Sequence, residues 1–183
     1  MRVYVDTEYT YPGMRRGTPR PTAADKRQIV QIAAIIYDEI AGEVVAEFNV
    51  LTKPSFQRRL PNFFTELTGI TQKQVQENGI SLKDAIAQFA AFCGSTPVWT
   101  FDKDEEVLKQ NAGYIKMKWP LSQNFVRVKS LLPSWGVNPD AFSSGTLYKA
   151  AGLDMLGHVH NALHDVKSMA AAVHVFETKQ LAN

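Results

Sequence analysis

The sequence has little of what marks secreted or membrane-embedded proteins. Its single cysteine, Cys93, lies in the apolar stretch 85–94, so no internal disulfide can form and the thiol is expected to be a small core side chain. No run approaches the roughly 20 apolar residues that a bilayer-spanning helix needs. The N-terminus enters a strand-like run without the long apolar region of a signal peptide. These absences predict a protein of the cytoplasm that has no membrane partner.

Charge of one sign is also scarce. The 20 Lys and Arg residues nearly balance the 18 Asp and Glu residues, and a net charge of +2 is too small to indicate nucleic-acid binding. Hydrophobic residues (45%) and charged residues (21%) occur at the levels of an ordinary globular protein. With 183 residues, no internal repeat and no low-complexity tract, the chain is expected to form one domain over residues 1–183.

Hydrophobic patterning predicts a mixed α/β architecture. Residues 27–54 are typical of two long strands joined by a turn, and with the run "VYV" they make three antiparallel strands formed locally. Farther along, strands alternate with helices, and Thr71 and Ser81 stand where helix N-caps belong. The expected helices cover 62–71, 71–79, 81–94, 104–115, 144–153 and 161–179, with strands at 96–101 and at the start of 124–132. This order predicts a mixed sheet flanked by helices.

Two carboxylates, Asp6 and Glu8, end the first apolar run, in "RVYVDTEYTY". Side chains alternate along a strand, so residues two apart point to the same side and bring two negative charges together. That repulsion needs an opposite charge, and a divalent cation would supply it. A solvated strand end is the alternative, because a motif as short as D-x-E also occurs by chance.

A second acidic segment follows the strand expected at 96–101. Asp104 precedes Val107 and Leu108 by three and four residues, so it stands at the N-terminus of a helix, above the helix face that turns to the core. Asp102 is expected in the connecting loop. A helix N-cap is a common role for an Asp at this place and is the alternative to a metal ligand.

The third segment is "HNALHD", in which His160 and Asp165 are five residues apart. A histidine on a loop is free to move and suits a general base. An aspartate fixed in the first turns of a helix suits a metal ligand. His158 and His164 flank these two residues, so a zinc site built from histidines is the alternative.

Taken together, the three segments resemble the motifs of the DEDDh exonucleases, which are 3′-to-5′ nucleases with a ribonuclease-H-like fold. "VDTE", "DEEVL" and "HNALHD" match the three motifs in the family's order, over nearly the whole chain. The matched residues are Asp6, Glu8, Asp104, His160 and Asp165. The resemblance implies a single exonuclease domain with a five-stranded mixed sheet, three antiparallel strands followed by parallel strands, flanked by helices.

The second motif departs from the family's pattern. Many relatives have Asn-x-x-Phe-Asp before the helix, where this chain has "TFDKD", so the matching acid is either Asp102 or Asp104. Asp104 is favoured, because the following apolar pair has the right distance from it alone.

The resemblance also implies a mechanism with two metal ions. Hard oxygen ligands favour Mg²⁺ or Mn²⁺ over zinc, and two such ions about 3.5–4 Å apart can activate a water and stabilise the leaving 3′ oxygen. Asp6, Glu8, Asp104 and Asp165 are then the metal ligands, and His160 is the base that takes the proton of the water. The expected substrate is single-stranded RNA or DNA with a free 3′ end, degraded stepwise to nucleoside 5′-monophosphates.

Several residues are expected to contact the substrate. The segment "LPNFFTELTGITQKQV" is most similar to the RNA-trimming exonucleases of the enhanced-RNAi type, which implies that Leu67 and Gly69 hold the terminal nucleotide. Thr7 and Tyr9 belong to the same set, and Tyr9 and Tyr11 either stack on a base or pack under the loop. Several relatives dimerise, which makes a homodimer one option for this chain.

A basic segment, residues 14–27, separates the first two expected strands. Its cations either follow the phosphates of a strand or form a solvated loop. They are Arg15, Arg16, Arg20, Lys26 and Arg27. Two other functions remain open: a binding module that keeps the fold without the chemistry, although all five motif residues are present, and a hydrolase of very short oligonucleotides.

Overall fold

The computed structural model describes residues 1–19, 21 and 25–181. Five strands form one sheet in the order β3-β2-β1-β4-β5. β1 pairs antiparallel with β2, and β2 pairs antiparallel with β3, whereas β1, β4 and β5 run parallel to one another. The strands are β1 (Arg2–Thr10), β2 (Gln28–Asp38), β3 (Glu43–Leu51), β4 (Val98–Thr100) and β5 (Phe125–Arg127). The five-stranded mixed sheet predicted from the sequence is confirmed.

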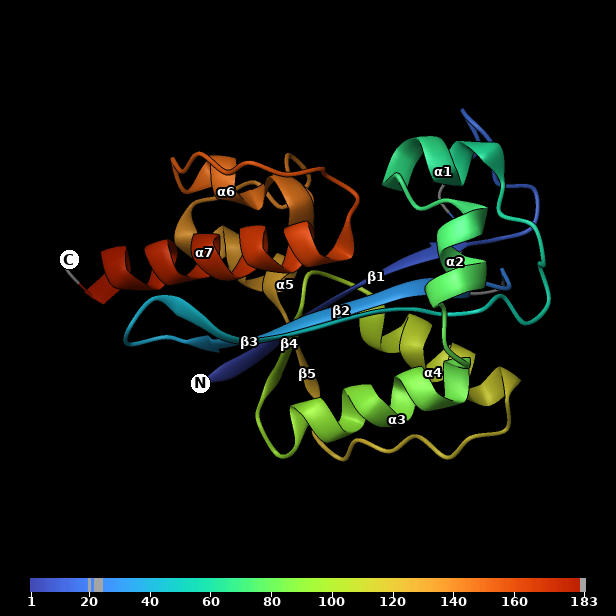
Figure 1. Cartoon of the computed structure of the whole chain (residues 1–183). Coiled ribbons are helices and arrows are strands. Elements are labelled where there is room, and N and C mark those ends of the chain that lie inside the picture. The colour runs from blue at the N-terminus through green and yellow to red at the C-terminus, as the bar shows by residue number, and fades with distance from the viewer. Residues whose placement is uncertain (20, 22–24, 182–183) are drawn as a thin grey trace.

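Helices cover both faces of this sheet (Figure 1). α3 and α4 pack on one face, and α7 packs on the other together with the short helices α5 and α6. The helices are α1 (Asn62–Thr68), α2 (Gln72–Asn78), α3 (Leu82–Cys93), α4 (Asp104–Tyr114), α5 (Val128–Leu131), α6 (Leu147–Ala150) and α7 (Ala162–Leu181), with 3₁₀ turns η1 (Leu132–Trp135) and η2 (Ser144–Thr146). No helix in the described ranges is long and apolar enough to span a membrane.

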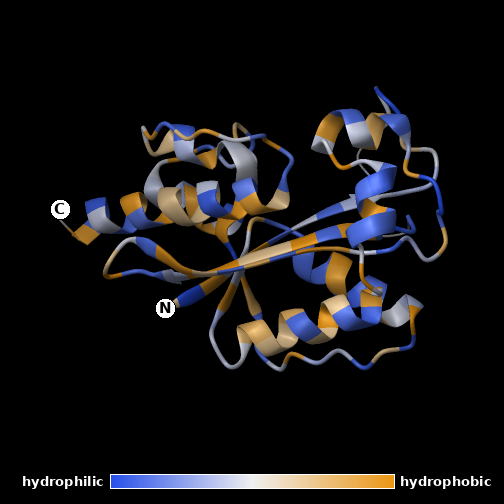
Figure 2. Ribbon diagram, in the orientation of Figure 1, coloured by the Kyte–Doolittle hydropathy of each residue, from blue (hydrophilic) through white to orange (hydrophobic). Residues whose placement is uncertain are grey.

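The central strands are apolar because both of their faces are covered. In β1, Val3 and Val5 belong to the core on the α3 and α4 side, whereas Tyr4 belongs to the core beneath α7. β2 is buried along most of its length, and Figure 2 shows it as largely hydrophobic. The alternation along β1 fixes which layer each following side chain faces, and this decides where Asp6, Thr7 and Glu8 point.

α1 and α2 lie beyond the end of β1 that is opposite the N-terminus, apart from the two main helix layers (Figure 1). Their small core is formed by Val30, Leu60, Phe64, Ile70 and Val75. The predicted N-caps are confirmed: Thr71 and Ser81 accept hydrogen bonds from the backbone N–H groups three residues on, which satisfies the first turns of α2 and α3.

Candidate active site

A cleft of about 690 Å³ opens where β1 ends, between α1, α4 and the start of α7. Its lining combines carboxylates, aromatic rings and a few cations. The residues that line it include Asp6, Thr7, Glu8, Tyr9, Tyr11, Arg27, Phe63, Leu67, Phe101, Asp102, Lys103, Asp104, Lys129, Asp140, Phe142, Ser144, His160 and Asp165. All five motif residues predicted from the sequence therefore meet in one cleft.

Asp6 and Glu8 lie within β1, just beyond the residues that pair with β4, and on the same side of the sheet as Tyr4 and α7, as the two-residue period predicts. Both are buried, with 7% and 9% of their surface exposed. Burial, followed by the negative charges of the neighbouring carboxylates Asp104 and Asp165, raises the pKa of each well above its usual range. Without an added cation, the ionised forms of this pair are therefore unfavourable.

Asp104 reaches the cleft from the first residue of α4. Its Oδ1 accepts hydrogen bonds from the backbone N–H of Thr7 (3.0 Å) and from the Thr7 hydroxyl (2.7 Å), and its Oδ2 accepts one from the Thr100 hydroxyl (2.5 Å). The N-cap of α4 is Lys103, so the alternative of Asp104 as the cap is wrong. These donors lower the pKa of Asp104 against the larger effect of burial, which raises it.

Asp102 lies in the loop before α4 and also lines the cleft. It is not among the carboxylates whose charge raises the pKa of Asp6 or of Glu8, whereas Asp104 acts on both. The geometry thus favours Asp104 for the second motif, as the following apolar pair predicted.

Asp165 projects from the first turn of α7 and is 3% exposed. The Ser144 hydroxyl lies 3.5 Å from its Oδ2, whereas its Oδ1 is buried and has no hydrogen-bond partner among the described residues. The carboxylate packs so closely on Gly145 that any Cβ there would lie 2.3 Å from Oδ1, so this position requires glycine. Burial is the main cause that raises the pKa of Asp165 to about 7.

His160 stands on the loop that leads into α7, in a left-handed backbone conformation with φ of 69°. Its ring can place a nitrogen with oxygens of Glu8 and Asp165 so that all three ligand atoms lie within 4.8 Å of one another. The neighbouring histidines turn elsewhere: His158 Nε2 lies 3.0 Å from the Leu67 carbonyl, and His164 Nε2 lies 3.3 Å from the Gly145 carbonyl. The three histidines therefore do not form the zinc site considered as an alternative.

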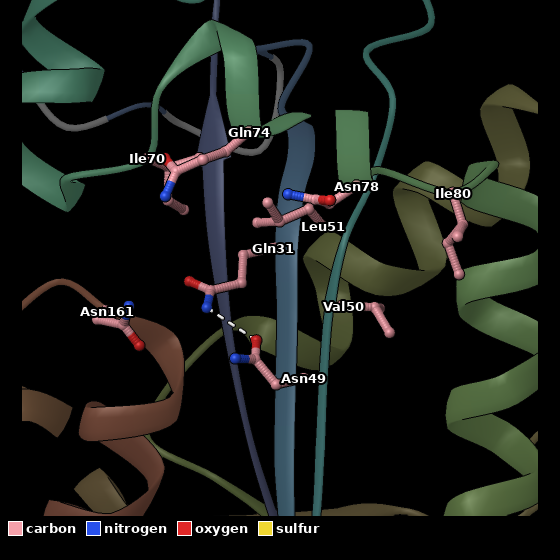
Figure 3. Close-up of a pocket in the computed structure, with 9 residues that line it drawn as sticks. All are labelled: Gln31, Asn49, Val50, Leu51, Ile70, Gln74, Asn78, Ile80 and Asn161. Carbon is pink, nitrogen blue, oxygen red and sulfur yellow. Dashed lines mark hydrogen bonds between the residues drawn. The ribbon is translucent and has the colours of Figure 1, made fainter. Parts of the chain in front are cut away.

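The first turn of α7 is held in place by a glutamine of β2. Gln31 Oε1 accepts a hydrogen bond from the Ala162 backbone N–H (3.1 Å), and Gln31 Nε2 donates to Asn49 Oδ1 (2.9 Å). Figure 3 shows these side chains in a second hollow of about 290 Å³, outside the acidic cleft. Its lining residues are Gln31, Asn49, Val50, Leu51, Ile70, Gln74, Asn78, Ile80 and Asn161. The hydrogen bond from Ala162 to Gln31 ties the start of α7 to β2, and so helps to position His160 and Asp165 at the cleft.

The residues expected to contact the substrate divide into two groups. Tyr9, Tyr11 and Leu67 line the cleft. Tyr9 also packs against the core beside α4, and the Tyr11 hydroxyl donates a hydrogen bond to the Pro19 carbonyl (3.1 Å). Both predicted roles, contact with the substrate and packing under the loop, are therefore compatible with the positions of these rings. Thr7 lines the cleft, but its hydroxyl is engaged with Asp104. Gly69 ends α1 as a left-handed C-cap with φ of 74°, which is a backbone role.

The basic segment does not behave as one unit. Arg16 forms an exposed ion pair with Glu66, and Arg15 and Lys26 are exposed. Arg20 lies outside the described residues. Arg27 differs, because it is 3% exposed and yet lines the cleft.

Three residues of the site gave no signal in the sequence. Thr100 and Ser144 hold carboxylates of the cluster, and Gly145 makes room for Asp165. None of them belongs to a motif, and Ser144 and Gly145 become visible only when their segment meets the start of α7. Thr100 precedes Asp104 by four residues in the sequence, but this spacing does not distinguish a buried hydrogen-bond donor from an ordinary strand threonine.

The donor set fits a hard divalent cation. Four carboxylates from β1, α4 and α7 face one cleft, and Asp165 Oδ1 is a buried acceptor with no partner in the described part of the chain. Carboxylate oxygens are the ligands that Mg²⁺ and Mn²⁺ prefer, whereas structural zinc is usually held by cysteine and histidine. A cation would also offset the mutual repulsion that raises the pKa values of Asp6 and Glu8.

Comparison with known proteins agrees with this geometry. ERI1 exoribonuclease 2 of Mus musculus is 39% identical over 62 residues, which are 34% of this chain and 9% of the mouse protein, so the chain corresponds to a small part of that relative. The solved nuclease domain of 3′hExo, a DEDDh family member bound to rAMP, superposes with a TM-score of 0.82 at 17% identity, over 97% of this chain and 91% of that one.

A second solved structure, E. coli exonuclease I in complex with a dA16 oligonucleotide, covers 100% of this chain and 42% of its own, with a TM-score of 0.68 at 17% identity. These likenesses confirm the ribonuclease-H-like fold of the DEDDh nucleases. The family model RNase_T, described as exonuclease, matches residues 3–173. Because that match spans almost the whole sequence, the chain belongs to the RNase_T exonuclease family.

Proposed function

We propose that this chain removes nucleotides one at a time from the 3′ end of single-stranded nucleic acid and releases nucleoside 5′-monophosphates. One observation carries the proposal: four buried carboxylates from three separate segments converge with His160 in an open cleft. Such a cluster is costly to a folded protein unless cations and a substrate use it. A pure binding module would not need to keep all five residues.

Asp6, Glu8, Asp104 and Asp165 would hold two Mg²⁺ or Mn²⁺ ions. Bound ions of this kind supply activation of a water and stabilisation of the leaving 3′ oxygen in an in-line displacement. The remaining work falls to the chain's own side chains. Thr7 and Thr100 orient the Asp104 carboxylate, and Ser144 and Gly145 do the same for Asp165.

His160 is the group that takes the proton from the attacking water. It stands on a loop beside Glu8 and Asp165, close enough to act on a water at the carboxylate cluster. An imidazole suits this step because its ordinary pKa lies near physiological pH, so it can accept a proton and release it again in each cycle.

Replacing His160 by alanine is therefore expected to lower kcat by about 10²- to 10⁴-fold, which is the usual contribution of a general base. Strand affinity in the presence of Mg²⁺ should be largely kept, because the four carboxylates are untouched. Single-turnover cleavage and fluorescence anisotropy on the same preparation measure the two properties. Full activity of this variant would remove His160 from the mechanism. His174→Ala removes an imidazole of α7 that does not line the cleft and is the control.

Thr100→Val is expected to lower kcat by about tenfold and to raise the Mg²⁺ concentration needed for half-maximal activity, because Asp104 Oδ2 loses its donor while the side-chain volume is kept. Thr100→Ser restores the hydroxyl and should restore the Mg²⁺ dependence. A merely structural role for Thr100 would lower the melting temperature without moving the Mg²⁺ dependence.

The direct test is a degradation time course on single strands labelled at the 5′ end, with RNA and DNA in parallel and with Mg²⁺, Mn²⁺ or EDTA. The proposal expects a ladder of one-nucleotide steps that EDTA abolishes. The two solved relatives hold rAMP and dA16, so both sugars belong in the test. If no strand is cut under any metal, the binding module becomes the better interpretation, and cutting of dinucleotides alone would favour a hydrolase of very short oligonucleotides.

A further inference from the structure

Arg27 is a buried cation in the wall of the cleft, and the proposed mechanism does not use it. It is 3% exposed and lines the cleft from the position just before β2. In the part of the chain that the structure describes, no carboxylate forms an ion pair with it. Burying a guanidinium without a partner anion is costly, so its position calls for an anion that arrives from outside.

The surroundings of Arg27 hold the guanidinium in one orientation. Its Nε donates a hydrogen bond to Gln110 Oε1 (2.9 Å), and its Cζ lies 6.0 Å from the centre of the Tyr9 ring. Gln110 belongs to α4 and Tyr9 to the end of β1, so both supports come from rigid elements. With Nε anchored, the two terminal nitrogens remain as a fork, the geometry that binds phosphate oxygens in pairs.

The other cations of the cleft are either paired with a carboxylate or exposed to solvent. Lys129 forms an ion pair with Asp140 (3.0 Å), and Lys103 is exposed at the start of α4. Arg15 and Arg16, which the sequence placed with Arg27 in one basic segment, do not line the cleft. Among the described residues, Arg27 is thus the cleft cation that is both buried and without a carboxylate partner.

Arg27 also stands apart from the carboxylate cluster. Its charge is not one of the main causes that shift the pKa values of Asp6, Glu8 or Asp104. Its anchor Gln110 lies six residues beyond Asp104 on α4, which is about 9 Å along the helix. A phosphate held at Arg27 would therefore be a different one from a phosphate held at the carboxylate cluster.

We propose that Arg27 binds the phosphate next to the scissile one, on its 5′ side. The proposal rests on the proposed function, because a strand that ends in a free 3′ hydroxyl has no phosphate beyond the terminal nucleotide. Every phosphate other than the scissile one then lies toward the 5′ end. The phosphate is either an internal phosphodiester of a long strand or the terminal 5′-phosphate of a dinucleotide, and both present the same oxygens to the guanidinium.

Binding of a labelled single-stranded 12-mer, measured by anisotropy with Mg²⁺ on a His160→Ala background, tests the proposal without turnover. Arg27→Gln should weaken binding about tenfold and lower the slope of log affinity against log salt by about 0.7, the value for one phosphate contact on a single strand. Arg27→Lys should keep the slope and weaken binding less. Arg15→Gln, from the exposed part of the same segment, is the matched control and should change neither quantity.

A change in the ligand tests the same contact even if Arg27→Gln does not fold. A neutral methylphosphonate placed at the phosphate next to the scissile one should weaken binding by the same factor as Arg27→Gln, and the two changes together should cost no more than one. Equal effects of methylphosphonate at every position, or equal binding by Arg27→Gln and Arg15→Gln, would overturn the proposal. So would an Arg27→Lys variant as weak as Arg27→Gln with an equally lowered melting temperature.

Two further arms identify the source of the phosphate and separate this proposal from the function itself. The first compares a dinucleotide that carries a 5′-phosphate with the same dinucleotide that carries a 5′-hydroxyl. If the phosphorylated form binds about tenfold tighter, and Arg27→Gln removes this difference, the contact is to a terminal phosphate. A methylphosphonate effect in the 12-mer alone assigns it to an internal one. Hydrolysis of the p-nitrophenyl ester of thymidine 5′-monophosphate by the wild-type chain tests the chemistry independently, since this ester has a single phosphate.

Discussion

Asp104→Asn is expected to lower the rate of strand degradation by about a thousandfold or more, whereas Asp102→Asn should remain near the wild-type rate. An amide keeps the size of the side chain. Its oxygen can still accept the hydrogen bonds from Thr7, and its NH2 group would donate to the Thr100 hydroxyl. The substitution removes the charge that would hold a cation, which is worth several kcal/mol in the transition state. Asp102 and Asp104 both line the cleft. The comparison of the two variants therefore tests position relative to the carboxylate cluster and not access to the substrate.

Single-turnover cleavage of a 5′-labelled strand over a range of Mg²⁺ concentrations measures this difference. Circular dichroism and thermal melting of both variants control for folding. If Asp102→Asn lost activity and Asp104→Asn kept it, the second motif would have to be moved by two residues, and the threonines around Asp104 would be structural.

Asp165→Asn is expected to stabilise the metal-free protein at pH 8 by on the order of 2–4 kcal/mol, and to have little effect on its stability at pH 4. The pKa of Asp165 rises from an ordinary 3.8 to about 7 on folding, chiefly because the carboxylate is buried. Between those two values the folded state binds a proton that the unfolded state has released. The contribution of Asp165 to stability is therefore full below pH 4, declines as the pH rises to about 7, and is level above that.

Urea denaturation in EDTA from pH 4 to pH 8 measures the free energy of unfolding of both proteins. The difference between them should grow over that interval. Adding Mg²⁺ at pH 8 should stabilise the wild type more than the variant, because ions bound to the folded state raise its stability and the variant lacks one of the proposed ligands. A difference that is constant from pH 4 to pH 8 would mean that Asp165 ionises in the folded protein much as it does in water.

Much of the fold was predictable because its signals are local. The β-branched runs of β1 and β2, the N-caps Thr71 and Ser81 and the apolar pair behind Asp104 each act over a few residues. The two-residue period of a strand was enough to place Asp6 and Glu8 on one side. That Asp104 and Asp165 join them came from the family resemblance, because spacing along the chain does not state distances between segments.

What could not be predicted depends on distances between segments. The side chain of Arg27 is held by Gln110 of α4, 83 residues along the chain. The need for glycine at Gly145 arises from a carboxylate 20 residues away. The basic segment was considered as a whole in the sequence, and only folding separates Arg27 from its exposed neighbours.

The first motif takes part in both helix layers at once. Asp6 and Glu8 face the α7 layer, while Thr7 between them donates to Asp104 of the α4 layer. One inserted or deleted residue within these three would exchange the two faces, sending a hydroxyl to one layer and a carboxylate to the other. Length changes are thus forbidden inside the motif by the pleat of the strand, independently of any metal. Natural variants of this chain should therefore keep a single residue between Asp6 and Glu8.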